Sequence, residues 1–469
     1  MSLSLAPGGA KPLAQRLRGL ITTLRADGIE ARTRRSALLG MAARVVNAGV
    51  VLLTHVLLAR LLGAAEFGLF SLATTWALVL LGLATLGLTM TPQRFAPEYA
   101  ASGERGLLAG LQRFAHFAPL AGGAAIAILG WAVLRFAPLG LAPELALAVG
   151  LALIALPALA VIDVVEGFAL AHEWHDLSYG VTFLLKPLLL PALFLAGYWQ
   201  GADGVAAALG AFALSAWIAA AALVAATARR MRPMVADAAP AFEPRRWFGL
   251  ALPALLADGA FLTMAYADVL VLSAFASPAE TGVYVAATKI VGVVAFVHFG
   301  LSYAAAHHFS ALHAQARREE LALYARKAAF WTFWPSLAAG AALTLAAGPL
   351  LGLFGAGFAQ GAAVVPILVA ALLARAAIGP SEQLLMMTNR QRSVTAIFAG
   401  AALLNVALAL ALAPLFGAVG VAIAMLAASL AATLATALAV RRSLGVFVHA
   451  FASPSLPEAE SGLGKEPPR

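Results

Sequence analysis

The sequence lacks cysteine, which excludes disulfide bonds and thiol chemistry. It is also poor in charge, because Asp, Glu, Lys and Arg make up only 11% of the chain, against about 25% in soluble domains. A Walker A loop, a nucleophile elbow and an HExxH zinc motif are missing, so the sequence supports neither an ATPase nor a hydrolase. We therefore expect a protein that is not an enzyme, with no cofactor and no bound metal.

Apolar residues make up 62% of the chain and give a mean hydropathy of +0.89. They run in blocks of about 20 residues or more, the length that a helix needs to cross about 30 Å of hydrocarbon. They do not alternate with polar residues as membrane β-strands do, and the first block is long enough to remain as an anchor. The pattern predicts an all-α membrane protein with about twelve transmembrane helices, at residues 36–60, 67–91, 108–134, 140–169, 177–200, 203–228, 247–275, 281–305, 323–347, 360–388, 393–414 and 418–440.

Basic residues fall almost entirely on one side of these spans. Seven precede the first span and most others follow spans two, six, eight, ten and twelve, whereas the opposite loops hold only Arg60 and Arg135. By the positive-inside rule both termini are cytoplasmic, and an even number of helices follows. The net charge of +9 is thus a signal of topology, and we expect no nucleic-acid partner.

Two motifs occur twice, and the two copies of each are separated by nearly the same length of chain. EFGLF at residues 66–70 returns as ETGVY at 280–284, and GADGVA at 201–206 returns as GAVGVA at 417–422. Shifting the first six predicted spans by the offset of the first motif also reproduces the last six. The sequence therefore predicts two parallel six-helix repeats around a central cavity, related by an axis along the membrane normal.

The repeat divides the chain into two lobes, which we expect to superpose helix for helix. The predicted parts are a basic cytoplasmic N-terminal segment at 1–35, an N-lobe at 36–228, a cytoplasmic linker at 229–246, a C-lobe at 247–442 and a cytoplasmic tail at 443–469. We expect the tail to be disordered, because it is rich in Pro, Glu, Ser and Gly.

The junction of spans one and two reads LLARLLGAAEFGLF at residues 57–70. Further segments follow it in a characteristic order: DVLVL at 268–272, ETGVY at 280–284, LFG at 353–355, and LN at 404–405 through Pro414 to Gly420. In order and spacing these segments resemble bacterial polysaccharide flippases of the multidrug/oligosaccharidyl-lipid/polysaccharide (MOP) exporter superfamily. The resemblance covers residues 36 to 442.

This resemblance implies a multi-pass protein of the bacterial inner membrane that moves undecaprenyl-pyrophosphate-linked oligosaccharide from the cytoplasmic to the outer leaflet. Its implied partners are the lipid-linked oligosaccharide and membrane lipids, with a polysaccharide polymerase or glycosyltransferases of the same pathway. The main alternative is a multidrug and toxic compound extrusion (MATE) transporter. Bacterial members coupled to protons or sodium often carry an acid in span one, where this chain offers Arg44 and Asn47.

Ionisable side chains inside the predicted spans are costly when they face lipid, by at least about 2.5–3.5 kcal/mol each at a helix centre. Most should therefore face a polar cavity, a partner or the interface. Basic groups at membrane depth would provide the countercharge for a pyrophosphate. The candidates for substrate binding are Arg44, Asn47, His55, Lys186, Lys289 and Arg375. The alternatives are pairing between helices, snorkelling for Lys186 and an interfacial role for Lys289.

The carboxylates inside the spans are candidates for gating or ion coupling: Asp163, Glu166, Asp258, Asp268 and Glu382. Asp163 and Glu166 lie three residues apart, which would suit a proton or sodium ion, although pairing with nearby basic groups remains the alternative. Arg375 and Glu382 are seven residues apart, so we expect both on one helix face lining the cavity. Energy coupling is left open by the sequence.

Arg44 and Asp258 stand at equivalent positions of the two repeats, with the same offset as the first repeated motif. We therefore expect them at similar depth, and we hypothesise that they form a cytoplasmic gate that an anionic substrate opens. The alternative is that each is neutralised within its own lobe.

Three further features have simpler interpretations. Pro187 and Pro191 should kink or open span five next to Lys186. His307, His308 and His313 should lie in the cytoplasmic loop after span eight without forming a zinc site. Tryptophans predicted at span ends should belong to the aromatic belts at the membrane surface, namely Trp131, Trp199 and Trp247.

Overall fold

The computed structural model describes residues 29–138, 140–315, 317–445 and 447–451. Throughout these residues the regular structure is helical, as the long apolar blocks predict. The predicted N-terminal segment up to residue 28 and the tail beyond residue 451 lie outside the described residues. The same holds for some side chains of the central helices, including those of Asp258 and His307.

The first half of the chain forms the helices α2 (Ile29–Ala84), η1 (Leu88–Met90), α3 (Thr91–Ser102), α4 (Arg105–Phe136), α5 (Pro143–Leu153), α6 (Leu156–Ala171), α7 (His175–Tyr179), η2 (Gly180–Leu185), α8 (Lys186–Trp199) and α9 (Gly204–Met231). The second half forms α10 (Pro244–Phe275), α11 (Pro278–Ala314), α12 (Arg318–Leu345), α13 (Ala347–Gly352), η3 (Phe358–Ala363), α14 (Val365–Ala376), α15 (Ser381–Met387) and α16 (Gln391–Leu444).

These elements combine into twelve membrane spans within the described part of the chain. The long helices α2 and α16 each hold two spans, because Gly63 (φ 77°) and Gly417 (φ 53°) take non-helical backbone angles that redirect the chain. Three other spans are assembled from pieces: α5 with α6, α7 with η2 and α8, and η3 with α14 and α15. Single helices α4, α9, α10, α11 and α12 supply the rest. The predicted twelve-helix architecture is therefore confirmed.

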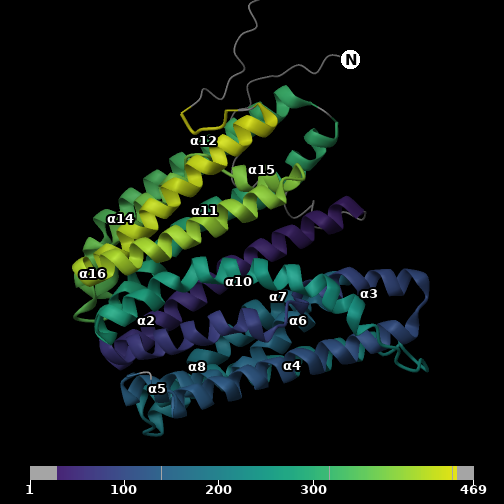
Figure 1. Ribbon diagram of the computed structural model, residues 1–469, viewed down its shortest axis with the longest axis horizontal. Helices are drawn as coiled ribbons and strands as arrows, with labels where there is room; N and C mark the ends of the chain where they lie inside the picture. The colour runs from purple at the N-terminus through teal and green to yellow at the C-terminus, as the bar shows by residue number, and fades with distance from the viewer. Residues whose placement is uncertain (1–28, 139, 316, 446, 452–469) are drawn as a thin grey trace, which may run out of the picture.

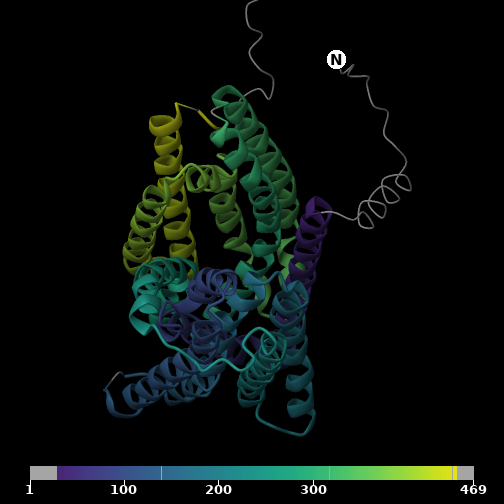
Figure 2. The same cartoon turned by 90° about the vertical axis from the view of Figure 1, so that its right-hand side faces the viewer.

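The spans form two lobes, which Figure 1 shows one above the other. Elements α2 to α9 build the lower N-lobe, α11 to α16 build the upper C-lobe, and α10 lies between them. The lobes converge where α2 and α16 kink and diverge toward α3 and α15, an arrangement seen along its axis in Figure 2. We call the converging side the motif end, because both repeated motifs lie there. The diverging side, where α4, α12 and α16 begin or end in arginines, is called the basic end.

The lobes meet at the motif end through two glycines at equivalent positions of the repeats. A Cβ atom added to Gly68 would lie 1.8 Å from the carbonyl oxygen of Pro278, and one added to Gly282 would lie 2.5 Å from that of Ala64. Only glycine permits backbones to approach so closely. Helices α2 and α11 therefore pack against each other through a small-residue contact that is nearly symmetric.

Other side chains tighten the same junction. The Arg60 guanidinium, at its Nε, donates a hydrogen bond to the Leu353 carbonyl oxygen across the lobes, at 2.8 Å. The rings of Phe67 and Phe358 meet edge to face with centroids 5.8 Å apart. Residues of the 57–70 and 353–355 segments, distant in the sequence, thus meet at the closed end of the molecule.

Within each lobe the two repeated motifs touch. The Glu280 carboxylate accepts a hydrogen bond from the Ala418 amide at 2.9 Å, where the chain turns at Gly417. In the N-lobe the Glu66 carboxylate lies against Gly204, where an added Cβ atom would come within 2.6 Å of Oε2. In both lobes the acid of the first motif therefore contacts the turn of the second motif, which explains why both motifs recur together.

The start of α10 is packed into the N-lobe. Trp247 is fully buried among apolar side chains of α3, α4, α6 and α9, so our prediction of a membrane-surface belt position for it was wrong. Its indole nitrogen donates to the Tyr99 hydroxyl at 3.0 Å, and that hydroxyl donates to Glu243 at 3.2 Å. Burial raises the pKa of Tyr99, which keeps the hydroxyl protonated. The helix that opens the second repeat is thus anchored to the first.

Two other expectations need correction. Helix α11 continues to Ala314, so His308 and His313 lie on its last turns and not in a loop. The predicted tail is also more ordered at its start, because α16 runs to Leu444 and Val448 and Ala450 are buried against the C-lobe. The Ala450 amide donates to the Ala377 carbonyl at 2.8 Å, where α14 has ended and leaves an acceptor without a helical partner.

Candidate functional site

The N-lobe gathers three of the predicted site residues around a fourth, Glu166. The Glu166 carboxylate accepts a hydrogen bond from the Thr182 hydroxyl at 3.1 Å. It interacts electrostatically with Asp163, Lys186 and Arg44. These residues come from three spans, so side chains distant in sequence form one polar cluster inside the lobe, which we call the N-lobe cluster.

Helix α2 brings Arg44 to this cluster. The Arg44 guanidinium lies over the Phe183 ring at 5.9 Å from its centroid, which adds a cation–π contact to the attraction of Glu166. One turn further, Asn47 Oδ1 is buried with no hydrogen-bond partner among the described residues. The Thr54 hydroxyl donates to the Val50 carbonyl of its own helix. The polar side chains of span one are therefore used in part within the helix, as for Thr54, and in part toward span five, as for Arg44.

Span five is irregular where it passes the cluster. Residues Gly180–Leu185 form a wide π-helical stretch, directly before Lys186 and Pro187. Proline has no amide hydrogen and its ring crowds the preceding turn, so a regular α-helical turn is not favoured here. The predicted local opening of span five is present, and it carries Thr182 and Phe183, the residues that contact Glu166 and Arg44.

Asp163 faces a different space from Glu166. It is exposed in a cavity of about 220 Å³ that is also lined by Thr85, Thr89 and Leu262. Because Leu262 belongs to α10, this cavity lies where α10 passes the N-lobe. Asp163 thus places a carboxylate at the boundary between the lobes.

A second cluster of polar side chains lies across the boundary between the lobes, near the motif end. The His55 imidazole lies edge to face with Phe67 and interacts electrostatically with Lys289 of α11. Lys289 in turn interacts with Asp268 of α10. The Tyr284 hydroxyl donates to the Asp268 carboxylate at 2.8 Å, and the side chains of both residues are buried. Three predicted site residues, His55, Lys289 and Asp268, therefore belong to one boundary cluster.

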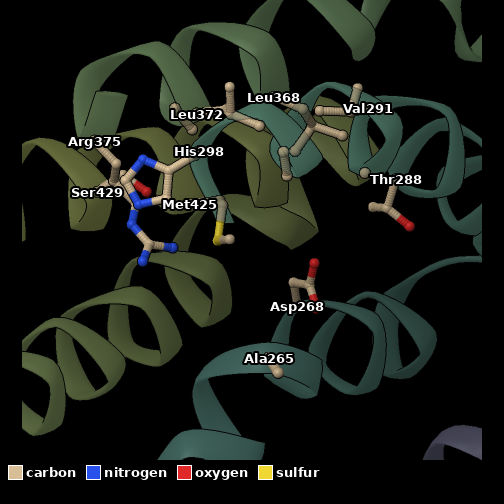
Figure 3. A pocket seen from close by; sticks show the side chains of 13 residues that line it. Ala265, Asp268, Thr288, Val291, His298, Leu368, Leu372, Arg375, Met425 and Ser429 are labelled. Carbon is tan, nitrogen blue, oxygen red and sulfur yellow. The ribbon is translucent and has the colours of Figure 1, made fainter. Parts of the chain in front are cut away.

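The C-lobe encloses a cavity of about 240 Å³ between α10, α11, α14 and α16. Figure 3 shows Asp268 and Thr288 on one side of it and Arg375, His298 and Ser429 on the other. Apolar side chains such as Leu372 and Met425 fill the wall between them. The cavity thus combines an apolar lining with polar groups of both signs, which is typical of a binding site.

Arg375 is bound to Glu382 by hydrogen bonds from one guanidinium nitrogen to both carboxylate oxygens, at 3.1 and 3.2 Å. The span is broken between them, since α14 ends at Ala376 and α15 begins at Ser381. Their pairing therefore depends on this bend and not on a continuous helix face. Arg375 lines the C-lobe cavity, whereas Glu382 is bonded to Arg375 and does not line the cavity, contrary to our expectation for both residues.

Sequence reasoning missed Tyr284, Thr182 and His298 as members of these groups. Tyr284 had a signal, because it closes the repeated motif where the first repeat has Phe70. Thr182 could have been found from its position just before Lys186 and Pro187, where an opening of span five was expected. His298 gives no sequence signal, since only the packing of α11 against α14 brings it to Arg375.

The predicted gate between Arg44 and Asp258 stays a prediction, because the Asp258 side chain lies outside the described residues. Arg44 lies near Glu166 of its own lobe in this structure. The basic side chains of the three groups have carboxylates close by, among them Glu166 for Lys186 and Asp268 for Lys289. Such pairs neutralise the cations inside the spans. An anionic ligand can bind there by replacing the carboxylate as the partner of the cation.

Solved structures of similar fold are membrane transporters. An inward-facing MATE-family multidrug resistance transporter of the MOP superfamily matches with a TM-score of 0.71 and 15% identity, covering 86% of this chain and 94% of that one. The lipid II flippase MurJ in an inward closed conformation matches with a TM-score of 0.65 and 13% identity, covering 86% and 87%. A MOP-superfamily transporter from Pyrococcus furiosus, whose binding pocket is described as having reverse polarity, matches at 0.59 and 17%, covering 91% and 98%.

The fold is therefore that of the twelve-helix transporters of the MOP superfamily. The family profile described as "Polysaccharide biosynthesis protein" matches residues 34–306, more than half of the chain, and the chain belongs to this family. A search of the curated proteins finds no match. The polysaccharide biosynthesis family and the transporter and flippase among the structural neighbours agree with the resemblance carried by the 57–70 and 280–284 segments.

Proposed function

We propose that this protein is a flippase that moves undecaprenyl-pyrophosphate-linked oligosaccharide from the cytoplasmic to the outer leaflet of the bacterial inner membrane. The observation that carries the proposal is the presence of cations inside both lobes, Arg44, Lys186, Lys289 and Arg375, held by carboxylates and by aromatic contacts. Membership of the polysaccharide biosynthesis family supports a glycan-linked substrate.

The basic end is cytoplasmic in this proposal, with both chain termini on that side. The lobes are packed together at the motif end and diverge at the basic end, so the substrate headgroup enters from the cytoplasm. Alternating access then requires the contacts at Gly68, Gly282 and Arg60 to open while the basic end closes. A reporter fused after Arg246 should be cytoplasmic and one at Gly201 external, and the reverse pattern would contradict this orientation.

Substrate chemistry enters through the basic pairs. A pyrophosphate offers several anionic oxygens, and arginine binds such groups through paired hydrogen bonds. When a pyrophosphate binds near Arg44 and Lys186, it replaces Glu166 as their counterion. A ligand can shift the protein from one conformation to another only if it binds the two conformations with different affinity. This exchange of partners supplies that difference.

The direct test is translocation by the purified full-length protein in liposomes. We expect a fluorescent undecaprenyl-pyrophosphate oligosaccharide to become accessible to a membrane-impermeant quencher. Replacing Arg44 or Lys186 by Gln should slow this by about tenfold or more, since each charge-assisted hydrogen bond contributes about 1.5–3 kcal/mol. Arg229→Gln, an exposed arginine at the end of α9, is the matched control and should leave the rate unchanged.

A MATE-type exporter of drugs or cations is the second candidate, and one observation favours it. Asp163 exposes a carboxylate in the cavity beside α10, where a cationic solute would bind. In cells, loss of the gene should then abolish drug resistance and leave surface polysaccharide unchanged. The flippase proposal requires the opposite, with polysaccharide lost and lipid-linked oligosaccharide accumulating inside.

A further inference from the structure

A small basic pocket lies at the basic end of the C-lobe, away from the polar groups described above. It has a volume of about 220 Å³ and is formed where four pieces of chain converge. The end of α11, the start of α12, the turn between α15 and α16, and the end of α16 each contribute. The lining residues are His313, Arg318, Leu321, Thr388, Arg390, Ser443 and Leu444.

Local backbone geometry aims the cations at this pocket. Asn389 takes a left-handed conformation with φ of 62°, which ends α15 and turns Arg390 back over the pocket. Arg318 is the first residue of α12, whose leading amides have no side-chain cap. The 28-residue helix α12 therefore adds the positive end of its dipole to the charge of the two arginines.

The positive charge of the pocket has no counterion within the described part of the chain. No carboxylate there lies within 4.0 Å of Arg318, Arg390 or His313, and the nearby Glu320 is bonded to Arg317. The hydroxyl hydrogens of Thr388 and Ser443 are used by carbonyl oxygens of their own helices. The donors of the pocket are thus those of its basic side chains, and their positive charge would attract an anion.

The chemistry of the lining selects one kind of anion. Arginine forks match the oxygens of a phosphate group, and Leu321 and Leu444 supply an apolar wall beside them. Basic pockets between helices at the membrane surface bind the headgroups of anionic lipids in this way. We propose that this pocket binds the phosphate of an anionic glycerophospholipid from the leaflet at the basic end of the protein.

A bound lipid would have a mechanical consequence. The pocket joins the turn after α15 to the ends of α11, α12 and α16, so a phosphate held there would cross-link four elements of the C-lobe. It would hold the C-lobe as one body while it moves relative to the N-lobe. This proposal does not depend on which substrate the protein transports.

The test compares lipid binding to the full-length protein in nanodiscs of phosphatidylcholine with increasing phosphatidylglycerol of the same acyl chains. Native mass spectrometry counts the retained phosphatidylglycerol, and thermal unfolding reports stabilisation. In the Arg318→Gln/Arg390→Gln variant we expect the apparent affinity to fall by about tenfold or more, because the phosphate loses the charge-assisted hydrogen bonds that the two arginines donate in the pocket. Replacement by Lys, which keeps the charge but not the fork, should give an intermediate loss.

The matched control is Arg229→Gln/Arg232→Gln, which removes the same charge from exposed arginines at the basic end of the N-lobe. Its affinity should stay within about twofold of the unmodified protein, since neither residue lines the pocket. An equal loss in both variants would mean diffuse attraction to the surface and would overturn the proposal. So would full competition by inorganic phosphate, which would point to a soluble phosphate compound. If the double variant does not fold, the single Arg390→Gln variant provides the same comparison.

Discussion

At the scale of single residues, charged side chains inside the spans lie next to groups that compensate their charge. Asp268 is buried on α10, and it has a tyrosine hydroxyl, a backbone amide and the charge of Lys289 around it. Arg375 has Glu382 on one side and the C-lobe cavity on the other. A charge at membrane depth therefore lies beside groups that make its burial tolerable, which agrees with the cost of leaving it to face lipid.

Replacing Tyr284 by Phe should lower stability by about 1–3 kcal/mol, because the buried Asp268 carboxylate loses its hydroxyl donor. Thermal unfolding of the purified protein in detergent measures this. Tyr198→Phe is the control, since the Tyr198 hydroxyl forms no hydrogen bond within the described residues, and it should change stability by less than about 0.5 kcal/mol. Equal unfolding temperatures for the two variants would contradict the importance of the Tyr284–Asp268 bond.

The sequence predicted which residues carry charge inside the spans but not which of them meet. Arg375 and Glu382 were expected on one helix face lining the cavity, but a break in the helix brings them together as a pair. Trp247 looked like a membrane-surface residue because it opens a span, and it is buried because α10 starts against α3. His298 could not be predicted, since its neighbours depend on how α11 packs against α14 and not on any local pattern.

At the scale of helices, small residues and helix breaks position the polar groups. The π-helical stretch of span five turns Thr182 to Glu166, and the bend after α14 lets Glu382 reach Arg375. Span limits were predicted to within a few residues for most helices, because they follow hydrophobic length. The breaks inside them were predicted only for span five, where proline marked it.

The contact between α2 and α11 gives the sharpest prediction at this scale. Gly68→Ala should lower stability by about 1–3 kcal/mol or more, because its Cβ atom would overlap the Pro278 carbonyl oxygen. Gly210→Ala is the control, since an added Cβ atom there meets nothing within 4 Å and alanine favours the helix. Thermal unfolding of both variants in detergent makes the comparison. A loss of stability in the Gly210 variant as large as in the Gly68 variant would contradict a specific contact between the lobes.

At the scale of the whole molecule, α10 couples the lobes. Its first turn is held in the core of the N-lobe by the hydrogen bond from Trp247 to Tyr99, while its last turns carry Asp268 to the boundary cluster and the C-lobe cavity. Any change in the angle between the lobes must therefore bend α10 or pull Trp247 from its pocket. The division of the chain at a 229–246 linker stays a prediction.

The gate prediction belongs to this scale. Cysteines at positions 44 and 258, in the otherwise cysteine-free chain, should form a disulfide only when the basic end is closed, since bonding requires Cα atoms within about 7 Å. Cross-linking yield on a gel, with and without lipid-linked oligosaccharide, measures it. A pair at 49 and 258 is the control, because position 49 lies on a different face of α2. Failure to cross-link under every condition would support neutralisation of Arg44 within its own lobe.

The pairing of Gly68 with Gly282 has a consequence for the origin of the protein. Contact between equivalent positions of two copies is what a two-fold homodimer makes across its axis. Each repeat has an even number of spans, so two separate copies would insert with the same orientation and could meet through this surface. The junction between the lobes thus has the form of an ancestral subunit interface. If so, the two halves produced as separate chains should reassemble by this contact without the 229–246 connection.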